Sequence, residues 1–166
     1  MDNQQPSTVV PSYFDDLRVG QRFVSGTHLI DEEQIIAFAK QFDPQPFHVD
    51  PEAAKQTVFH GHVASGWHTA AITMRLLVTS GLSIEGGLVG AGVEVNWPRP
   101  TRPGFVLRVE TEVTELRQSR SRPDIGLATI RSETTNQQGE VVQVLIAKLV
   151  VPRRGSQETL HNQIQT

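Results

Sequence analysis

The chain contains no cysteine among its 166 residues. This absence excludes disulfides, thiolate zinc sites and a cysteine nucleophile, and it is compatible with a reducing compartment. The sequence also lacks an apolar run long enough to cross a bilayer, and its N-terminal stretch MDNQQPSTVVPSYF has neither a leader nor a lipidation pattern. Lysine and arginine form no dense run and the net charge is -3, so nucleic acid has no general attraction for this chain. We therefore expect a cytoplasmic protein without a nucleic-acid or membrane partner.

The composition that is present indicates one globular domain. Hydrophobic residues make up 37% and charged residues 20% of the chain, as in ordinary folded proteins. The length is sufficient for one domain with a substantial core and too short for two of ordinary size. Residues 1–12 and 153–166 are polar and lack a periodic apolar face. We expect flexible tails there, around a domain of residues 13–152.

The first part of this domain has the pattern of a strand followed by a helix. Residues 19–30 resemble a strand, and Asp31 with Gln34 has the spacing of a capping box at a helix start. A residue before proline avoids helical angles, so the helix should stop at Asp43, ahead of Pro44. Its predicted apolar face comprises Ile35, Ile36, Ala39 and Phe42.

A second, longer helix is predicted over the segment ASGWHTAAITMRLLVTSG. It has apolar residues at helical spacing and ends at Gly81, a residue suited to a left-handed cap. Much of its circumference is apolar, which predicts a helix in the core. A short helical turn is also expected to begin at Pro51. The predicted apolar positions of the long helix are Trp67, Ala70, Ala71, Met74, Leu77 and Val78.

The second half of the chain predicts antiparallel strands. In FVLRVETEVTEL, the side chains of Val109, Thr111 and Val113 point to one face, and the charged residues between them point to the other. IGLATIRSETTN and EVVQVLIAKLVV follow, joined by the hairpin sequence QQGE. The last strand is nearly continuous apolar, as a central or interface strand would be. The sequence therefore predicts an α+β domain in which a curved antiparallel sheet surrounds a long helix.

Asp43 and His48 are the first candidate catalytic residues. Both lie in FDPQPFHVD, where two prolines favour a rigid, non-helical connection that could present the two side chains toward one point. A carboxylate beside an imidazole can hold a water molecule and move its proton, which suits the addition or removal of water. The alternative is that Asp43 caps a turn and His48 is a surface residue.

Ser65 and Gly66 mark a second candidate, at the start of the long helix. The unpaired N–H groups of a helix N-terminus can hold a carbonyl oxygen as it becomes an enolate, and glycine leaves room for a ligand. The two residues could equally serve as a simple cap. Ser65 as a hydrolase nucleophile is a weaker alternative, because HVASG is not G-x-S-x-G and follows no predicted strand.

The histidines and arginines supply further candidates. A zinc site is not expected, because no H-E-x-x-H or comparable signature is present. Several arginines follow the strands and could hold the phosphates of a nucleotide-bearing substrate, or could simply be solvated turn residues. The histidines are His28, His60, His62 and His68, and the arginines are Arg99, Arg102, Arg117, Arg120 and Arg122.

FDPQPFHVDPEAA followed by FHGHVASGWHTAAITMRLL resembles the MaoC-like acyl dehydratases, which include the R-specific enoyl-CoA hydratases and the NodN-like proteins. The hydratase motif of that family reads roughly D-x-N-P-[apolar]-H, and Asp43, Pro46, Phe47 and His48 match it. PTRPGF resembles the family's turn into a strand, so the resemblance covers most of the chain. Gln45 departs from the pattern, because asparagine is usual there.

The resemblance implies a single hot-dog domain that forms a homodimer or a higher homo-oligomer. It also implies that Asp43 and His48 activate a water that adds to C3 of a trans-2-enoyl thioester, giving a (3R)-3-hydroxyacyl thioester. Gly66, with Ser65 nearby, would polarise the thioester carbonyl. The carrier would be coenzyme A or acyl carrier protein, and no metal or redox cofactor would be needed.

Two other functions remain open at this point. A hot-dog thioesterase would need only one carboxylate to activate water against the carbonyl carbon. A non-catalytic acyl-thioester binding protein would keep the pocket after losing the chemistry. Gln45 makes both alternatives relevant, because glutamine is one methylene longer than the asparagine usual there and could alter the geometry of the site. Displacing a catalytic group by about an ångström can lower the reaction rate on the order of a hundredfold.

Overall fold

The computed structural model describes residues 10–79 and 82–155. Most of both predicted tails, and the predicted cap at Gly81, lie outside these ranges. Of the described helices, none combines the length and the apolar character needed to cross a membrane. The elements in chain order are η1 (Phe14–Asp16), β1 (Arg22–Ile30), α1 (Glu32–Phe42), α2 (Pro46–Val49), α3 (Pro51–Ala54), α4 (Gly66–Thr79), β2 (Val89–Asn96), β3 (Phe105–Gln118), β4 (Ile125–Thr135) and β5 (Val141–Pro152).

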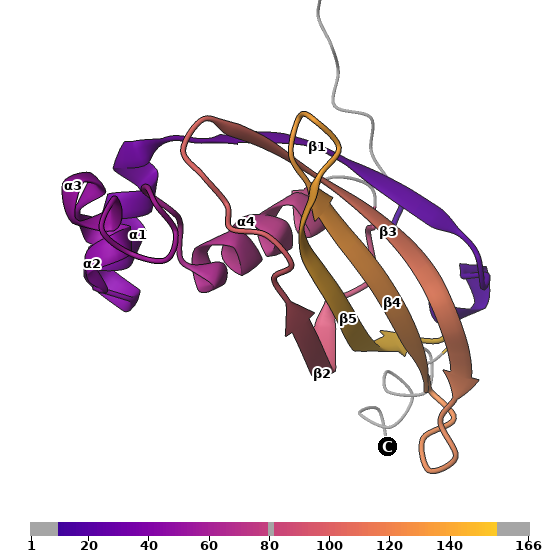
Figure 1. Cartoon of the computed structure of the whole chain (residues 1–166). Helices are drawn as coiled ribbons and strands as arrows, with labels where there is room; N and C mark the ends of the chain where they lie inside the picture. The colour runs from indigo at the N-terminus through magenta and orange to yellow at the C-terminus, as the bar shows by residue number, and fades with distance from the viewer. Residues whose placement is uncertain (1–9, 80–81, 156–166) are drawn as a thin grey trace, which may run out of the picture.

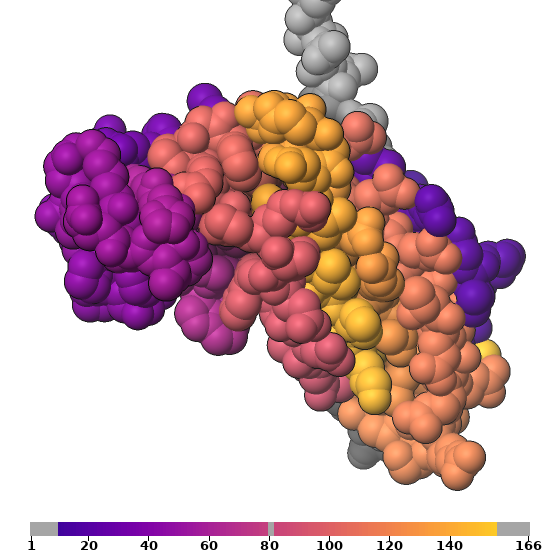
Figure 2. Space-filling view, in the orientation of Figure 1, coloured from indigo at the N-terminus to yellow at the C-terminus, as the bar shows by residue number. Residues whose placement is uncertain are grey.

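The five strands form one antiparallel sheet in the order β1-β3-β4-β5-β2. The sheet curves along the long helix α4, while α1, α2 and α3 gather beside one end of it (Figure 1). In the space-filling view these three helices form a projecting lobe next to the segment that joins β2 to β3 (Figure 2). The predicted α+β class, with a long helix against a curved antiparallel sheet, is confirmed.

The predicted strands agree with the sheet. Val109, Thr111 and Val113 of β3 are buried on one face, as their alternation predicted. Their burial arises because that face packs on the core, whereas the intervening charged side chains remain at the surface. QQGE connects β4 to β5, and Gly139 takes the left-handed conformation that its turn requires. The apolar strand β5 is internal, between β4 and β2.

Helix α1 begins and ends where predicted, but its capping box is only half formed. Asp31 accepts a hydrogen bond from the backbone N–H of Gln34 at 2.8 Å. The side chain of Gln34 does not return this bond; it donates to the carbonyl of Leu29 at 3.1 Å. Ile35 and Ala39 are buried as expected, whereas Phe42 is 64% exposed and lies outside the core.

The face of α4 that packs on the sheet differs from the predicted one. Trp67, Met74 and Val78 were expected in the core and are exposed. The buried face is partly polar, because hydroxyl groups on it find partners: Thr73 Oγ1 lies 2.7 Å from Thr134 Oγ1 of β4. The prediction was correct for Leu77, but counting only apolar residues missed the buried polar positions and placed three exposed residues in the core. The buried residues of α4 are His68, Thr69, Ile72, Thr73, Leu76 and Leu77.

The core consists of two clusters. One lies under α4 and includes Ile35, Ile72 and Leu107; the other packs η1 against the strands and includes Phe14. The inner ends of the predicted tails contact this second region, since the N–H of Ser12 donates to the carbonyl of Ser83 and the guanidinium of Arg153 to Asp15. The outer parts of the tails stay predictions.

Candidate active site

The break between α1 and α2 positions the two predicted acid/base residues. Helix α1 ends at Phe42, and Gln45 is extended (φ -80°, ψ 146°), as the residue before Pro46 should be. Pro46 then begins the four-residue helix α2, so His48 lies on a helical turn instead of the predicted non-helical connection. This arrangement folds the chain back and brings His48 to Asp43.

His48 is held in one orientation by the backbone. Its ring is buried, and Nδ1 lies 2.8 Å from the carbonyl oxygen of Val63. A carbonyl can only accept, so Nδ1 carries the proton of this hydrogen bond. Nε2, 3.3 Å from Asp43 Oδ2, is therefore the atom free to take up or release a proton. The edge of the Phe47 ring packs against the imidazole.

Asp43 is held as a carboxylate by neutral donors and by His48. The Nε2 of Gln45 donates to Asp43 Oδ1 at 2.7 Å. A hydrogen bond from Ser65 lowers the pKa of Asp43 most, followed by the bond from Gln45 and by the charge that His48 carries when its ring is protonated, while partial burial acts in the opposite direction. Asp43 is consequently ionised at neutral pH and, being a weak base, is suited to orient and stabilise a proton carrier.

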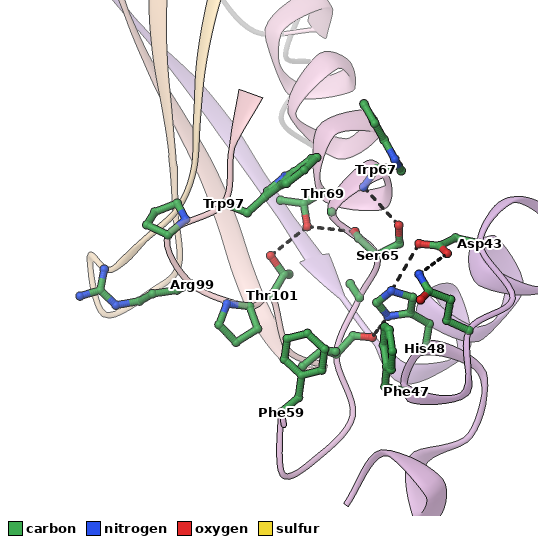
Figure 3. Close-up of a pocket in the computed structure, with 16 residues that line it drawn as sticks. Asp43, Phe47, His48, Phe59, Ser65, Trp67, Thr69, Trp97, Arg99 and Thr101 are labelled. Atoms are coloured by element: carbon green, nitrogen blue, oxygen red, sulfur yellow. Dashed lines mark hydrogen bonds and ion pairs between the residues drawn. The ribbon is translucent and has the colours of Figure 1, made fainter. Parts of the chain in front are cut away.

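The start of α4 lies beside this pair (Figure 3). Ser65 is buried and acts as the helix cap, with its Oγ accepting from the N–H of Trp67 at 3.2 Å. The N–H of Gly66 has no acceptor among the described residues. Since a helix N-terminus carries a partial positive charge, this N–H is a suitable donor to a carbonyl oxygen that gains charge.

These groups share one cavity of about 440 Å³. Its floor is the start of α4, and its opposite wall is the segment between β2 and β3. That segment is tied to the helix, because the carbonyl of Thr101 accepts from the N–H of Ala64 at 2.8 Å and its hydroxyl accepts from Thr69 at 2.9 Å. The lining includes Asp43, Gln45, His48, Ser65, Gly66, Trp97 and Arg99. The Asp43–His48 pair and the start of α4 therefore face the same cavity.

A family model described as "MaoC like domain" matches residues 16–136. The chain belongs to this family. The crystal structure of a MaoC-like dehydratase from Rhodospirillum rubrum is 57% identical, with a TM-score of 0.84 over 86% of this chain and 98% of that chain. The (R)-specific enoyl-CoA hydratase of R. rubrum is 30% identical over 145 residues, 86% of this chain and 94% of that protein. The uncharacterized protein YdeM of Bacillus subtilis is 33% identical over 126 residues, 74% of this chain and 86% of that protein.

The arginines of this MaoC-like domain are not brought together. Arg99 lines the cavity. Arg102 donates to the carbonyl of Phe59 at 2.8 Å and thereby holds the loop before α4. Arg120 and Arg122 lie between β3 and β4, at the end of the sheet remote from α1–α3 (Figure 1). Arg117, on β3, does not line the cavity either. Of the arginines in the described part of the chain, Arg99 alone lines this cavity, and a phosphate-binding role for any of them stays a prediction.

The histidines of the MaoC-like domain are dispersed as well. His62 Nε2 donates to the carbonyl oxygen of His48 at 2.8 Å, and His28 contacts Gln34. His68 stacks on Phe38 with ring centroids 4.5 Å apart. No group of three or more metal-ligating side chains is found in the part of the chain that the structure describes.

Sequence reasoning missed Trp97 and the residue that anchors it. Trp97 lines the cavity, and its Nε1 donates to Gln143 Oε1 at 2.8 Å. A signal was available, because Gln143 is a polar residue inside the apolar strand EVVQVLIAKLVV and is completely buried. A buried glutamine requires partners, but sequence does not say which residues supply them.

Proposed function

We propose that the protein is a hydro-lyase that adds water to trans-2-enoyl thioesters and gives (3R)-3-hydroxyacyl thioesters. The observation that carries the proposal is the 3.3 Å approach of His48 Nε2 to Asp43 in a cavity that also contains the start of α4. The similarity to the (R)-specific enoyl-CoA hydratase of R. rubrum supports the same reaction class.

The proposed first step is the addition of water to C3. A water between Asp43 and His48 donates one hydrogen to the carboxylate and the other to Nε2, because both are acceptors. Its oxygen lone pair then points toward the substrate. As the C3–O bond forms, Nε2 takes the water's proton, and the π electrons of the C2–C3 bond move to the thioester. Asp43 stabilises the imidazolium that forms.

The second step returns the proton. The enolate oxygen accepts from the Gly66 N–H, which lowers the energy of the negative charge in a site partly shielded from water. The imidazolium then donates its Nε2 proton to C2, on the same face that received the hydroxyl group. Water has been added across the double bond, and both catalytic side chains are back in their starting protonation states.

The carrier of the acyl group is proposed to be coenzyme A or acyl carrier protein. Both present a thioester on a phosphate-bearing arm, and Arg99 at the cavity wall supplies a cation for that arm.

We also propose that two copies of the chain pair along β2. That strand forms one edge of the sheet and exposes Val89 and Val93.

The test is the loss of enoyl-thioester absorbance with a panel of trans-2-enoyl-CoAs, with free thiol assayed in parallel. Asp43→Asn and His48→Ala should each lower kcat by about a hundredfold or more, as expected for the loss of an acid/base group. His60→Asn is the matched control. His60 is exposed, does not line the cavity and has a φ of 50°, a conformation that asparagine tolerates.

The outcomes separate the three functions. Loss of absorbance without thiol, abolished in both site variants, is the expected result. Release of free thiol would show that the protein hydrolyses thioesters and would contradict the proposed hydratase function. Binding of acyl-CoA with neither reaction would leave a non-catalytic binding protein. Chiral analysis of the product tests the configuration at C3, and an S product would contradict the proposed facial selectivity.

A further inference from the structure

Two neighbouring cavities share one tryptophan, Trp67, which contacts a second tryptophan, Trp97. Trp67 lines both the catalytic cavity and a second cavity of about 510 Å³. The lining of the second cavity consists of apolar side chains and glycines from α4 and the sheet, among them Met74 and Leu145, together with Leu88 just before β2. It has the character required for an alkyl chain, and it contributes nothing to the acid/base chemistry described above.

Trp97 contacts Trp67 edge to face, with ring centroids 5.4 Å apart. Trp97 also lies directly over the first residue of α4: a Cβ atom on Gly66 would come within 2.7 to 2.9 Å of three carbons of the indole. The acyl group of a thioester whose carbonyl is bound at Gly66 would therefore lie next to this indole. The labelled rings can be followed in Figure 3.

A chain of buried hydrogen bonds fixes the orientation of Trp97. Its Nε1 donates to Gln143, the Nε2 of Gln143 donates to Thr73 at 2.9 Å, and Thr73 bonds Thr134. Gln143, Thr73 and Thr134 are completely buried. Rotating the indole away would leave the Gln143 carbonyl without its partner, which costs free energy in a buried site. The wall formed by Trp97 is thus held by the sheet and by α4 together.

We propose that the Trp67–Trp97 pair is the specificity determinant for acyl length, closing the catalytic cavity against the apolar cavity so that short enoyl thioesters are preferred. This inference rests on the proposed function, because it assigns the acyl group to the catalytic cavity. Each methylene accommodated or rejected by an apolar pocket changes selectivity by about 10- to 200-fold. Removing one indole should join the two cavities and transfer the preference to longer chains.

Tryptophan fluorescence offers a readout that does not depend on turnover. The chain has two tryptophans, and they are the two members of this pair. Butyryl-CoA and octanoyl-CoA have no double bond to hydrate, so their titration measures binding alone. In the unaltered protein we expect octanoyl-CoA to bind no more tightly than butyryl-CoA. In Trp67→Ala, with Trp97 as the remaining reporter, octanoyl-CoA should bind at least about tenfold more tightly than butyryl-CoA.

Val78→Ala is the matched control. Val78 is on the same helix, is 57% exposed where Trp67 is 62% exposed, and lines neither cavity. It should leave the preference unchanged. If Trp67→Ala does not fold, Trp97→Phe takes its place, since phenylalanine is smaller and cannot donate to Gln143. The same proteins are then assayed for hydration of but-2-enoyl-CoA and oct-2-enoyl-CoA, in which kcat/KM should follow the binding preference.

The results distinguish this inference from the proposed function. Octanoyl-CoA binding at least tenfold more tightly than butyryl-CoA in the unaltered protein would overturn the role of the pair, even if hydration is observed. An unchanged preference in the tryptophan variant, or no binding of either ligand, would overturn it too. The expected binding preferences without hydration of any enoyl-CoA would support the acyl-length role and refute the hydratase.

Discussion

Acidification from pH 7 to pH 5 should destabilise the folded protein by about 2 kcal/mol through one side chain, His68. This residue lies in the first turn of α4 and is only 7% exposed. Its ring is stacked on Phe38 at an interplanar angle of 2°, and its Nδ1 has no hydrogen-bond partner among the described residues. The site therefore suits a neutral imidazole, because a proton added at Nδ1 would find no hydrogen-bond acceptor among the described residues.

Burial, with a smaller contribution from His28, lowers the pKa of His68 from 6.5 to about 4. Between these two values the unfolded chain binds a proton that the folded protein does not, so stability rises with pH across the window. In the opposite direction, stability falls as the pH drops below 6.5, and the loss is complete near pH 4. The full effect is about 3 kcal/mol, of which about 2 kcal/mol separates pH 7 from pH 5.

The measurement is urea unfolding at pH 7 and pH 5 for the unaltered protein and for His68→Phe. Phenylalanine keeps a flat ring against Phe38 and cannot titrate. The loss of unfolding free energy between pH 7 and pH 5 should therefore be smaller by about 2 kcal/mol in the variant. Taking the difference between the two proteins cancels the contributions of all other titrating groups. Equal losses in the two proteins would refute the assignment of this pH dependence to His68.

Three further predictions concern the core, the site and the sheet edge. Gly126→Ala should cost about 1–3 kcal/mol in urea unfolding, because its new methyl group would overlap the ring of Phe14, and Phe14→Leu in the same protein should recover part of that loss. His62→Leu should lower kcat, measured by enoyl-CoA hydration, because it leaves the carbonyl of His48 unpaired, whereas His62→Gln retains a donor and should retain more activity. Val93→Lys should shift the protein toward monomer in light scattering, because it introduces a charge on the exposed edge strand β2.

The fold was predictable where its causes are local. The alternation of Val109, Thr111 and Val113 identified the core face of β3, and Asp31 and Pro44 marked the two ends of α1. The packed face of α4 was not predictable in this way. Thr73 is buried because Thr134, 61 residues later in the chain, supplies a hydrogen-bond partner, and such a pairing is a property of the assembled sheet.

The candidate site also combines a contact that is local in sequence with contacts that are not. Asp43 and His48 are five residues apart, with prolines that restrict the intervening backbone, so their approach could be predicted. The carbonyl that fixes His48 belongs to Val63, and the indole over Gly66 belongs to Trp97, 31 residues away. Neither contact has a sequence signature. The sequence predicted that Asp43 and His48 lie close together but could not predict the surroundings that orient them.

The geometry of the Asp43–His48 pair also favours hydration of the substrate over hydrolysis of its thioester. Hydrolysis by a single carboxylate would be served best by a carboxyl group of ordinary or raised pKa facing the carbonyl carbon. Asp43 instead has a lowered pKa and is engaged by Ser65, Gln45 and His48. A weak base of this kind is better suited to stabilise a protonated imidazole than to deprotonate water alone. Because the Nδ1 proton of His48 is committed to the backbone, its Nε2 can take one proton and return the same one, which is the proton balance of hydration.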